Sequence, residues 1–364
     1  MRRKSKIVKV REIEIGGGLS PVVQGMAKTD ITNIEATVSQ INEIKKAGAK
    51  LVRVAVPNLK AARTISRIKN MVDVPLAADI HFNYRLALEA IDQGIDKIRI
   101  NPGNMSLKDI LKVAKKAKEN KIPLRVGVNS GSLPKDVLDK VSKLRDKKEE
   151  RCQFTAKAMV DIALGCINFL EKNGIEDIIV SLKSSEVPVT ILANKIIAEK
   201  IPYPIHLGVT ATGLPPDGLI KSVLGIGALL SLGIGDTIRV SLTCDSVQEV
   251  RLAYQILKYL DLTDERGPIL IACPTCGRCR GDVHSIAREV MSRISKIDLP
   301  LKIAVMGCEV NGPGEAMEAD IGIACTRGGG ILFKKGRLLN RVKREELIDT
   351  LMKEIYSMKE RINS

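Results

Sequence analysis

The feature that most constrains the fold of this chain is a regular alternation of short β-rich runs with longer amphipathic stretches. The stretches at 34–47 and 107–119 space their apolar residues as helices do, and Gly48 and Gly174 fall where helices would end. Such alternation is typical of parallel strands covered by helices. We count eight β-rich runs, at 21–26, 51–56, 75–80, 97–101, 123–128, 177–182, 204–209 and 236–242.

Eight such units in about 260 residues have the size of a TIM-type (β/α)8 barrel, which we predict for residues 1–262. A doubly wound open sheet is the alternative, but the chain has no stretch resembling a G-x-G-x-x-G nucleotide loop. The β-like runs at 269–272, 301–306, 321–324 and 331–334, with a helix at 285–297, predict a small α+β domain over 263–364. The charged segment 344–361 is interpreted as a solvated surface helix.

Polar residues stand at almost every predicted strand end, where the chemistry of barrel enzymes is located. The cations among them would meet at the barrel mouth and form a pocket suited to a phosphate or diphosphate. Gly103, Gly131 and Gly213 could let backbone N–H groups approach the phosphate oxygens. The strand-end residues are Gln24, Arg53, Asp79, His81, Arg99, Asn101, Arg125, Asn129, Ser181, Lys183, His206, Thr210, Arg239 and Ser241.

Cysteines concentrate near the end of the chain, in the motif Cys273-Pro-Thr-Cys276-Gly-Arg-Cys279 and at Cys308. A C-x-x-C pair with one distant cysteine forms a three-thiolate set, which can bind a [4Fe-4S] cluster and leave one iron open for substrate. Structural zinc is the alternative, although a zinc ribbon needs a second C-x-x-C. Cys279 is either a spectator thiol or an alternative ligand.

The net charge and the amino-acid composition limit the kinds of molecule that this protein could bind. Lys plus Arg is 58 against 42 for Asp plus Glu, a formal net charge of +16, which attracts anionic ligands or acidic proteins. Aromatic residues are only 2%, which disfavours single-stranded nucleic acid as a partner. No apolar run is long enough to span a bilayer and no secretory signal is evident, so we expect a cytoplasmic protein with no membrane or nucleic-acid partner.

Several motifs in order resemble the 4-hydroxy-3-methylbut-2-enyl diphosphate synthase family, over nearly the whole chain and in its bacterial two-domain form. The family's enzymes act in the methylerythritol phosphate route to isoprenoids. The motifs are LVRVAVP at 51–57, ADIHF at 78–82, RINPGN at 99–104, RVGVN at 125–129, SLK at 181–183, GDTIRVSL at 235–242, CPTCGR at 273–278 and NGPGEA at 311–316.

The resemblance implies an iron-sulfur oxidoreductase that opens and dehydroxylates 2-C-methyl-D-erythritol 2,4-cyclodiphosphate. It implies one [4Fe-4S] cluster per subunit, held by Cys273, Cys276, Cys308 and Glu315. It further implies a homodimer, and reduced flavodoxin or ferredoxin as electron donor. Asp79, His81, Asn129 and Glu315 would be catalytic, and the substrate would be bound by Arg53, Arg99, Asn101, Arg125, Lys183, Arg239 and Ser241.

Two stretches depart from the family pattern. Thr210-Ala211-Thr212-Gly213 stands where the family has Thr-Glu-Ala-Gly, so an acid expected near the substrate is missing, and Asp217 or a water would have to compensate. Gln24-Gly-Met-Ala-Lys28-Thr replaces Gln-Ser-Met-Thr-Asn-Thr and adds a cation.

These departures keep other functions open. One is a diverged iron-sulfur paralogue that acts on another phosphorylated small molecule. The others are a zinc-bearing nucleic-acid-binding protein and a cluster-carrying electron-transfer protein.

Overall fold

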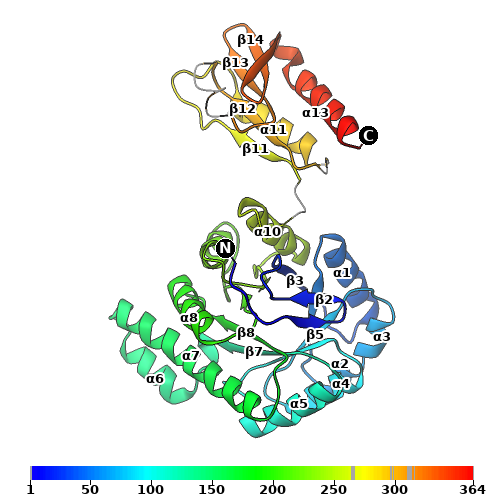
Figure 1. The fold of residues 1–364 in the computed structure, drawn as a ribbon, viewed down its shortest axis with the longest axis vertical. Coiled ribbons are helices and arrows are strands. Elements are labelled where there is room, and N and C mark those ends of the chain that lie inside the picture. Colours follow the sequence, from blue (N-terminus) through cyan, green and yellow to red (C-terminus); the bar gives the residue numbers. More distant parts are fainter. Residues whose placement is uncertain are drawn as a thin grey trace. The chain divides into compact units, whose positions relative to one another are not determined.

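The computed structural model describes residues 2–263, 267–295, 297, 299–309, 314 and 316–363. The chain divides into two compact units, Met1–Thr263 and Asp264–Ser364 (Figure 1). The first unit is built around an eight-stranded sheet and the second around a five-stranded sheet.

The first unit is a parallel barrel. Its strands follow one another in the order β8-β7-β6-β5-β4-β3-β10-β9, and every pairing is parallel. A parallel bridge between Val180 and Ile205 joins the two ends of this sheet, so the barrel is confirmed and the open sheet is excluded. The strands are β3 (Val22–Met26), β4 (Leu51–Ala55), β5 (Leu76–Asp79), β6 (Lys97–Ile100), β7 (Leu124–Asn129), β8 (Ile178–Lys183), β9 (His206–Leu207) and β10 (Thr237–Ile238).

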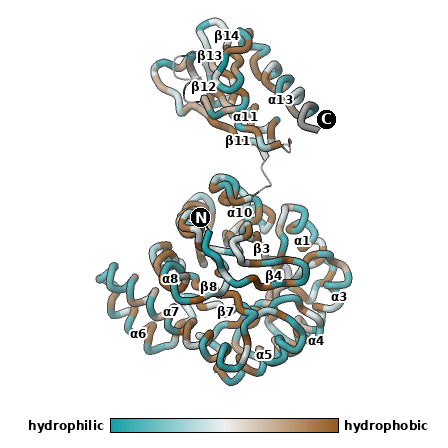
Figure 2. The backbone as a smooth tube through the Cα atoms, viewed as in Figure 1, coloured by the Kyte–Doolittle hydropathy of each residue, from teal (hydrophilic) through white to brown (hydrophobic). Residues whose placement is uncertain are grey.

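Amphipathic helices cover the outside of the barrel. In α5 the buried residues Ile110, Val113, Ala114 and Ala117 recur every three or four positions, so one stripe packs on the strands while lysines face outward. Figure 2 shows hydrophobic (brown) and hydrophilic (teal) residues alternating along these helices. The helices are α1 (Ile34–Lys46), α2 (Leu59–Ala62), α3 (Ile65–Lys69), α4 (Tyr84–Asp92), α5 (Leu107–Glu119), α6 (Lys135–Lys143), α7 (Lys148–Lys172), α8 (Val187–Lys200), α9 (Asp217–Ser231) and α10 (Ser246–Tyr259).

A hairpin of β1 (Val8–Val10) and β2 (Ile13–Ile15) closes one end of the barrel. Val8, Val10 and Ile15 pack against residues at the beginnings of the barrel strands, Val22, Leu51, Ala77 and Ile179. The apolar side chains of this hairpin therefore close the barrel at the amino-terminal ends of its strands, and the carboxyl ends of the strands form the open mouth. The sequence analysis predicted no strand in this segment.

The second unit is α+β, as predicted. Strands β11 (Ile269–Ala272), β12 (Lys302–Met306) and β13 (Ile321–Thr326) are parallel neighbours, and β14 (Gly329–Lys334) and β15 (Arg337–Val342) continue the sheet antiparallel. Helices α11 (Val283–Ile294) and α13 (Leu347–Asn363), with a 3-10 turn at Arg344–Glu346, complete the unit.

Two features of this unit differ from the sequence-based expectations. Strand β15 was not predicted, because its residues are mostly exposed and lack apolar alternation; Lys335 and Gly336 both have positive φ and form the tight turn that pairs it with β14. The final helix is not merely a solvated surface helix. Its residues Leu347, Leu351 and Ile355 are buried in the core of the unit, so only its other face is charged.

Candidate functional site

A polar cavity opens at the carboxyl ends of the barrel strands. Most of the residues predicted at strand ends meet there, from β4, β5, β6, β7, β8 and the segment after β10. Val209 and Thr210 complete one wall. The lining residues are Arg53, Asp79, His81, Arg99, Arg125, Asn129, Ser181, Lys183, Val209, Thr210, Arg239 and Ser241.

Asp79 is the carboxylate of this cavity, and cations surround it. Its oxygens lie 3.3 Å from Arg99 Nη1, 3.7 Å from Arg53 Nη1 and 3.6 Å from His81 Nε2. Burial alone raises the pKa of Asp79, but Arg53, the His81 ring, Arg99 and Arg125 outweigh burial and hold this pKa well below its usual range. Asp79 is therefore ionised at neutral pH and orients its neighbours rather than donating a proton.

The cavity carries more positive charge than one carboxylate can balance. Burial, together with the repulsion from Arg53 and Arg99, lowers the pKa of Arg125 well below its ordinary value. Burial and Arg53 lower the pKa of Arg239 to about 10. Among the described residues, Arg99 Nε, Arg125 Nε and Nη1, and Arg239 Nε are buried without a hydrogen-bond partner. A ligand with two or more negative charges would satisfy these donors and relieve the repulsion.

Lys183 is held from behind by His206, which lies beneath the cavity and not in its wall. Lys183 Nζ lies 3.0 Å from His206 Nε2, and His206 Nδ1 lies 2.6 Å from Thr237 Oγ1. Burial and the Lys183 charge hold the pKa of His206 well below its usual value, so the imidazole is neutral and its Nε2 accepts a hydrogen bond from Lys183 Nζ. Gly208 makes room for this arrangement, because a Cβ atom there would lie 2.6 Å from Lys183 Nζ.

Some sequence-predicted residues support the cavity without lining it. Asn101 is fully buried; its side chain donates to Ser132 Oγ at 2.8 Å and accepts from the Gly103 N–H at 3.0 Å. This contact engages the Gly103 N–H group that was expected to face a phosphate. Gln24 is buried, and neither polar atom of its side chain has a hydrogen-bond partner within the described structure.

Ala211, which stands where the family pattern has an acid, lies in the segment after β9. Ala211 is exposed with φ of 51°, and the Thr212 hydroxyl donates to the Ser241 carbonyl oxygen. Asp217, the candidate to compensate, is the exposed first residue of α9 and is not among the residues that line the cavity.

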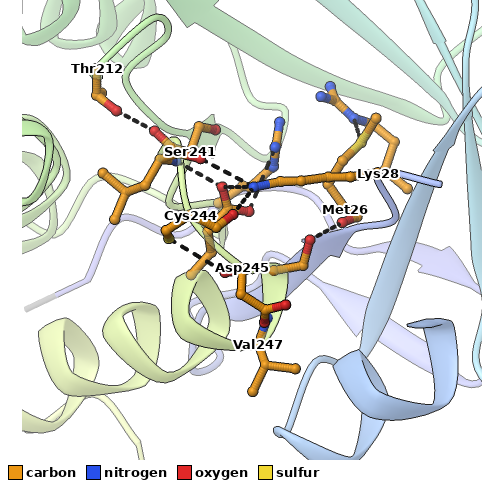
Figure 3. A network of polar contacts seen from close by, with 12 residues as sticks. Met26, Lys28, Thr212, Ser241, Cys244, Asp245 and Val247 are labelled. Atoms are coloured by element: carbon orange, nitrogen blue, oxygen red, sulfur yellow. Dashed lines mark hydrogen bonds and ion pairs between the residues drawn. The ribbon is translucent and has the colours of Figure 1, made fainter. Parts of the chain in front are cut away.

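Sequence reasoning missed a polar network beside the cavity that joins Lys28 to Glu249 (Figure 3). Glu249 is only 2% exposed and lies on the buried stripe of α10 with Ser246, Val250 and Ala253. An acidic residue on the apolar stripe of this helix was a signal that could have marked Glu249 as paired, although not which residue pairs with it.

In the second unit, the ends of adjacent parallel strands place two of the predicted ligands. Cys273 follows β11 and Cys308 follows β12, and the Cys273 N–H donates to Val305 O at 3.0 Å. The Thr275 N–H lies 3.3 Å from the Cys273 sulfur, as expected where backbone amides stabilise a thiolate. Cys276 is exposed and Cys308 is buried. The predicted oxygen ligand Glu315 lies outside the described residues.

The sulfur atoms of Cys279 and Cys273 both lie close to Gly307. A Cβ atom at Gly307 would lie 2.9 Å from the Cys279 sulfur and 3.6 Å from the Cys273 sulfur. Cys279 donates its S–H to Gly281 O at 3.1 Å. Among the described residues, no three potential ligands already stand in a metal-binding arrangement. The thiol set nevertheless fits an iron-sulfur cluster in donor chemistry.

Fold and site together define the class: a (β/α)8-barrel protein with a cationic pocket for a small polyanion, followed by an α+β unit with clustered thiols. The profile of the GcpE TIM-barrel domain matches residues 5–254, and that of the GcpE protein C-terminal domain matches residues 269–357. The chain therefore belongs to the GcpE family, whose curated members are named 4-hydroxy-3-methylbut-2-en-1-yl diphosphate synthase (flavodoxin).

Two similar relatives with this name illustrate the match. The protein from Caldanaerobacter subterraneus subsp. tengcongensis is 50% identical over 359 residues, which cover 98% of each chain. The protein from Fusobacterium nucleatum subsp. nucleatum is 50% identical over 356 residues, again 98% of each chain. Similarity over this length does not favour a diverged paralogue or a zinc-bearing nucleic-acid-binding protein.

Among solved structures, dihydropteroate synthase from Stenotrophomonas maltophilia superimposes with a TM-score of 0.50 at 14% identity, covering 71% of this chain and 97% of that one. This likeness concerns the fold alone. Within the described part of the chain, none of the helices has the length and apolar character that a bilayer crossing requires.

Proposed function

We propose that this protein catalyses the reductive opening of 2-C-methyl-D-erythritol 2,4-cyclodiphosphate to 4-hydroxy-3-methylbut-2-enyl diphosphate in isoprenoid biosynthesis. Two electrons enter, the ring C–O bond to phosphate breaks, and the C3 hydroxyl takes up a proton and leaves as water. The observation that carries this proposal is the cavity in which five cations face one ionised carboxylate, in a chain half identical to synthases of that name. The five cations are Arg53, Arg99, Arg125, Lys183 and Arg239.

The cavity residues divide into charge carriers and orienting groups. The five cations, with Asn101 behind the wall and Ser241 within it, would hold the cyclic diphosphate, because buried cations without full pairing bind phosphate oxygens strongly. Ionised Asp79 would fix the guanidinium of Arg99 and the ring of His81. His81, 40% exposed and hydrogen-bonded to the Asn104 side chain at 3.1 Å, would move a proton, and Asn129 would orient the substrate hydroxyl.

The second unit would carry the redox centre. We propose that Cys273, Cys276 and Cys308 hold three irons of one [4Fe-4S] cluster per subunit and that Glu315 holds the fourth through oxygen. When bound, such a cluster supplies single electrons and a Lewis-acidic iron. This assignment leaves Cys279 a spectator thiol. It also makes residues 1–262 the substrate-binding domain and residues 263–364 the cluster domain.

The net charge of this chain and the names of its relatives both indicate the kind of electron donor. The names of the similar synthases specify flavodoxin, and the net charge of +16 favours an acidic donor such as reduced flavodoxin or ferredoxin. We propose that the protein works as a homodimer in the cytoplasm.

The test is anaerobic purification with iron and sulfide analysis, followed by EPR of the dithionite-reduced protein before and after addition of the cyclodiphosphate. The proposal expects about four irons per chain and an EPR signal that changes with substrate. An unchanged signal would favour a closed cluster with Cys279 as the fourth ligand. Colourless protein with one zinc, after failed reconstitution with iron, would overturn the proposal.

A further inference from the structure

We infer that Lys28 is a positioning residue of the anion pocket: its ammonium group engages Glu249 and the carbonyl oxygens that follow β10, so that Arg239 keeps its charge available to the bound diphosphate. The inference deepens the proposed function and rests on it for the identity of the ligand. Lys28 lies in the stretch 24–29, which departs from the family pattern described in the sequence analysis and adds a cation there.

The contacts of Lys28 converge on one place. Lys28 Nζ lies 3.0 Å from Glu249 Oε1, 3.1 Å from Leu242 O and 2.6 Å from Cys244 O. An ammonium group has three donors, and here each has an acceptor. Figure 3 shows Lys28 reaching from the end of β3 across to the segment that carries Ser241 and Cys244. The Lys28 side chain is 35% exposed, whereas that of Glu249 is 2% exposed.

Glu249 is shared between two cations, and Lys28 is the nearer one. Glu249 Oε1 accepts from Lys28 and from the Leu242 N–H at 2.7 Å. Glu249 Oε2 has no hydrogen bond and lies 3.7 Å from Arg239 Nη2, beyond hydrogen-bond distance. The carboxylate thus engages Lys28 closely and Arg239 only at long range, which leaves the Arg239 guanidinium facing the cavity that it lines.

Removing the Lys28 charge would change this balance. A buried carboxylate that loses its partner is costly, and the nearest remaining cation is Arg239. The guanidinium would then close on Glu249 and form the bidentate pair that its geometry favours. Arg239 would be withdrawn from the ligand, and the pocket would lose one of its cations.

Lys28 also shapes the backbone beside the ligand. The carbonyl oxygens of Leu242 and Cys244 accept from Lys28, and that of Ser241 accepts from Thr212. Carbonyl oxygens repel phosphate oxygens, and here Lys28 and Thr212 donate to these three carbonyl oxygens. These contacts tie the segment that carries Ser241 to Lys28, which follows β3, and to Thr212.

The experiment measures binding of inorganic pyrophosphate by calorimetry to the full-length protein and its variants. Lys28→Met is expected to weaken binding about tenfold, the effect of withdrawing one charge contact. Lys28→Arg should retain affinity within about twofold, because a guanidinium supplies the same charge and donors. Lys60→Met, which removes an exposed lysine outside the cavity lining, is the matched control and should bind like the wild type.

The decisive variant is the double change Lys28→Met with Glu249→Gln. It removes both the ammonium and the carboxylate that would capture Arg239, so binding should return to within about threefold of the wild type. This variant also leaves no unpaired carboxylate in the interior, which keeps the test valid if Lys28→Met alone folds poorly. In turnover, Lys28→Met should raise the KM for the cyclodiphosphate by the same factor and change kcat less than about twofold.

Two outcomes would overturn the inference: wild-type affinity in Lys28→Met, or no recovery in the double variant. Pyrophosphate binding requires neither the cluster nor turnover. Failure of the proposed reaction with the affinity pattern intact would therefore refute the reaction and leave the role of Lys28 standing.

Discussion

Replacing Asp79 by Asn should destabilise the barrel and at the same time increase its stabilisation by polyanions. Asp79 is 12% exposed and balances Arg99, which is 4% exposed, and Arg53, which is 13% exposed. Removing one partner from a buried ion pair leaves uncompensated charge and costs about 3 kcal/mol. For a unit of this size that loss corresponds to a fall in Tm of about 6–12 °C.

The pH dependence of this variant gives a second readout. The folded-state pKa of Asp79 is depressed, so its ion pairs add stability above its unfolded pKa of about 4 and lose it as the pH falls through the folded value. The wild type should therefore lose part of its advantage over Asp79→Asn below about pH 4. At neutral pH the difference should be constant.

Hydrogen exchange measured by mass spectrometry on the full chain is the suitable assay, because it resolves the β4–β7 segments from the second unit. Asp73→Asn is the matched control, since Asp73 is 86% exposed and its pair with Lys45 lies on the surface. Saturating pyrophosphate should protect Asp79→Asn more than the wild type. Equal protection of wild type and Asp79→Asn, with and without pyrophosphate, would refute the charge balance described for the cavity.

Three further predictions follow from the packing and the charges. Gly208→Ala should weaken pyrophosphate binding at least tenfold in calorimetry, because its Cβ would meet Lys183 Nζ and the Arg239 carbonyl oxygen; an unchanged affinity would show that Lys183 can move aside. Burial and the neighbouring arginines, Arg125 and Arg53 foremost, lower the pKa of Lys183, so an anion that raises this pKa should bind with proton uptake that increases as the pH rises, and binding enthalpies that do not depend on the ionisation enthalpy of the buffer at alkaline pH would contradict this. Leu351→Ala should lower the stability of the second unit by about 2–5 kcal/mol, seen as faster exchange in β13 and β14; exchange like that of the wild type would mean that α13 does not support this sheet.

The barrel could be predicted because each strand and helix carries its own periodic signal. The strand positions and the cations at their ends depend on local pattern and on one topological rule. The predicted strands at 204–209 and 236–242 were too long, however, and the observed β9 and β10 cover only His206–Leu207 and Thr237–Ile238. After β10, the carbonyl groups bond to the side chains of Thr212 and Lys28 instead of a neighbouring strand.

The part of the site that could not be predicted depends on contacts between distant segments. Lys28 and Glu249 are 221 positions apart, and neither belongs to a local sequence motif from which their contact could be predicted. Likewise, His206 was noted as a strand-end residue, but its place behind Lys183 depends on the register of β8, β9 and β10. The role of Asn101 as a brace between loops follows from the fold of the loop after β7, which carries no periodic signal.

The most direct test of the central claim is turnover of 2-C-methyl-D-erythritol 2,4-cyclodiphosphate by the anaerobically purified holoenzyme with reduced flavodoxin, with products identified by mass spectrometry. The account predicts 4-hydroxy-3-methylbut-2-enyl diphosphate as the product, formed despite Ala211, and loss of activity with Cys308→Ser but not with Cys279→Ser. Cluster-replete protein that binds the cyclodiphosphate and releases no such product would contradict it.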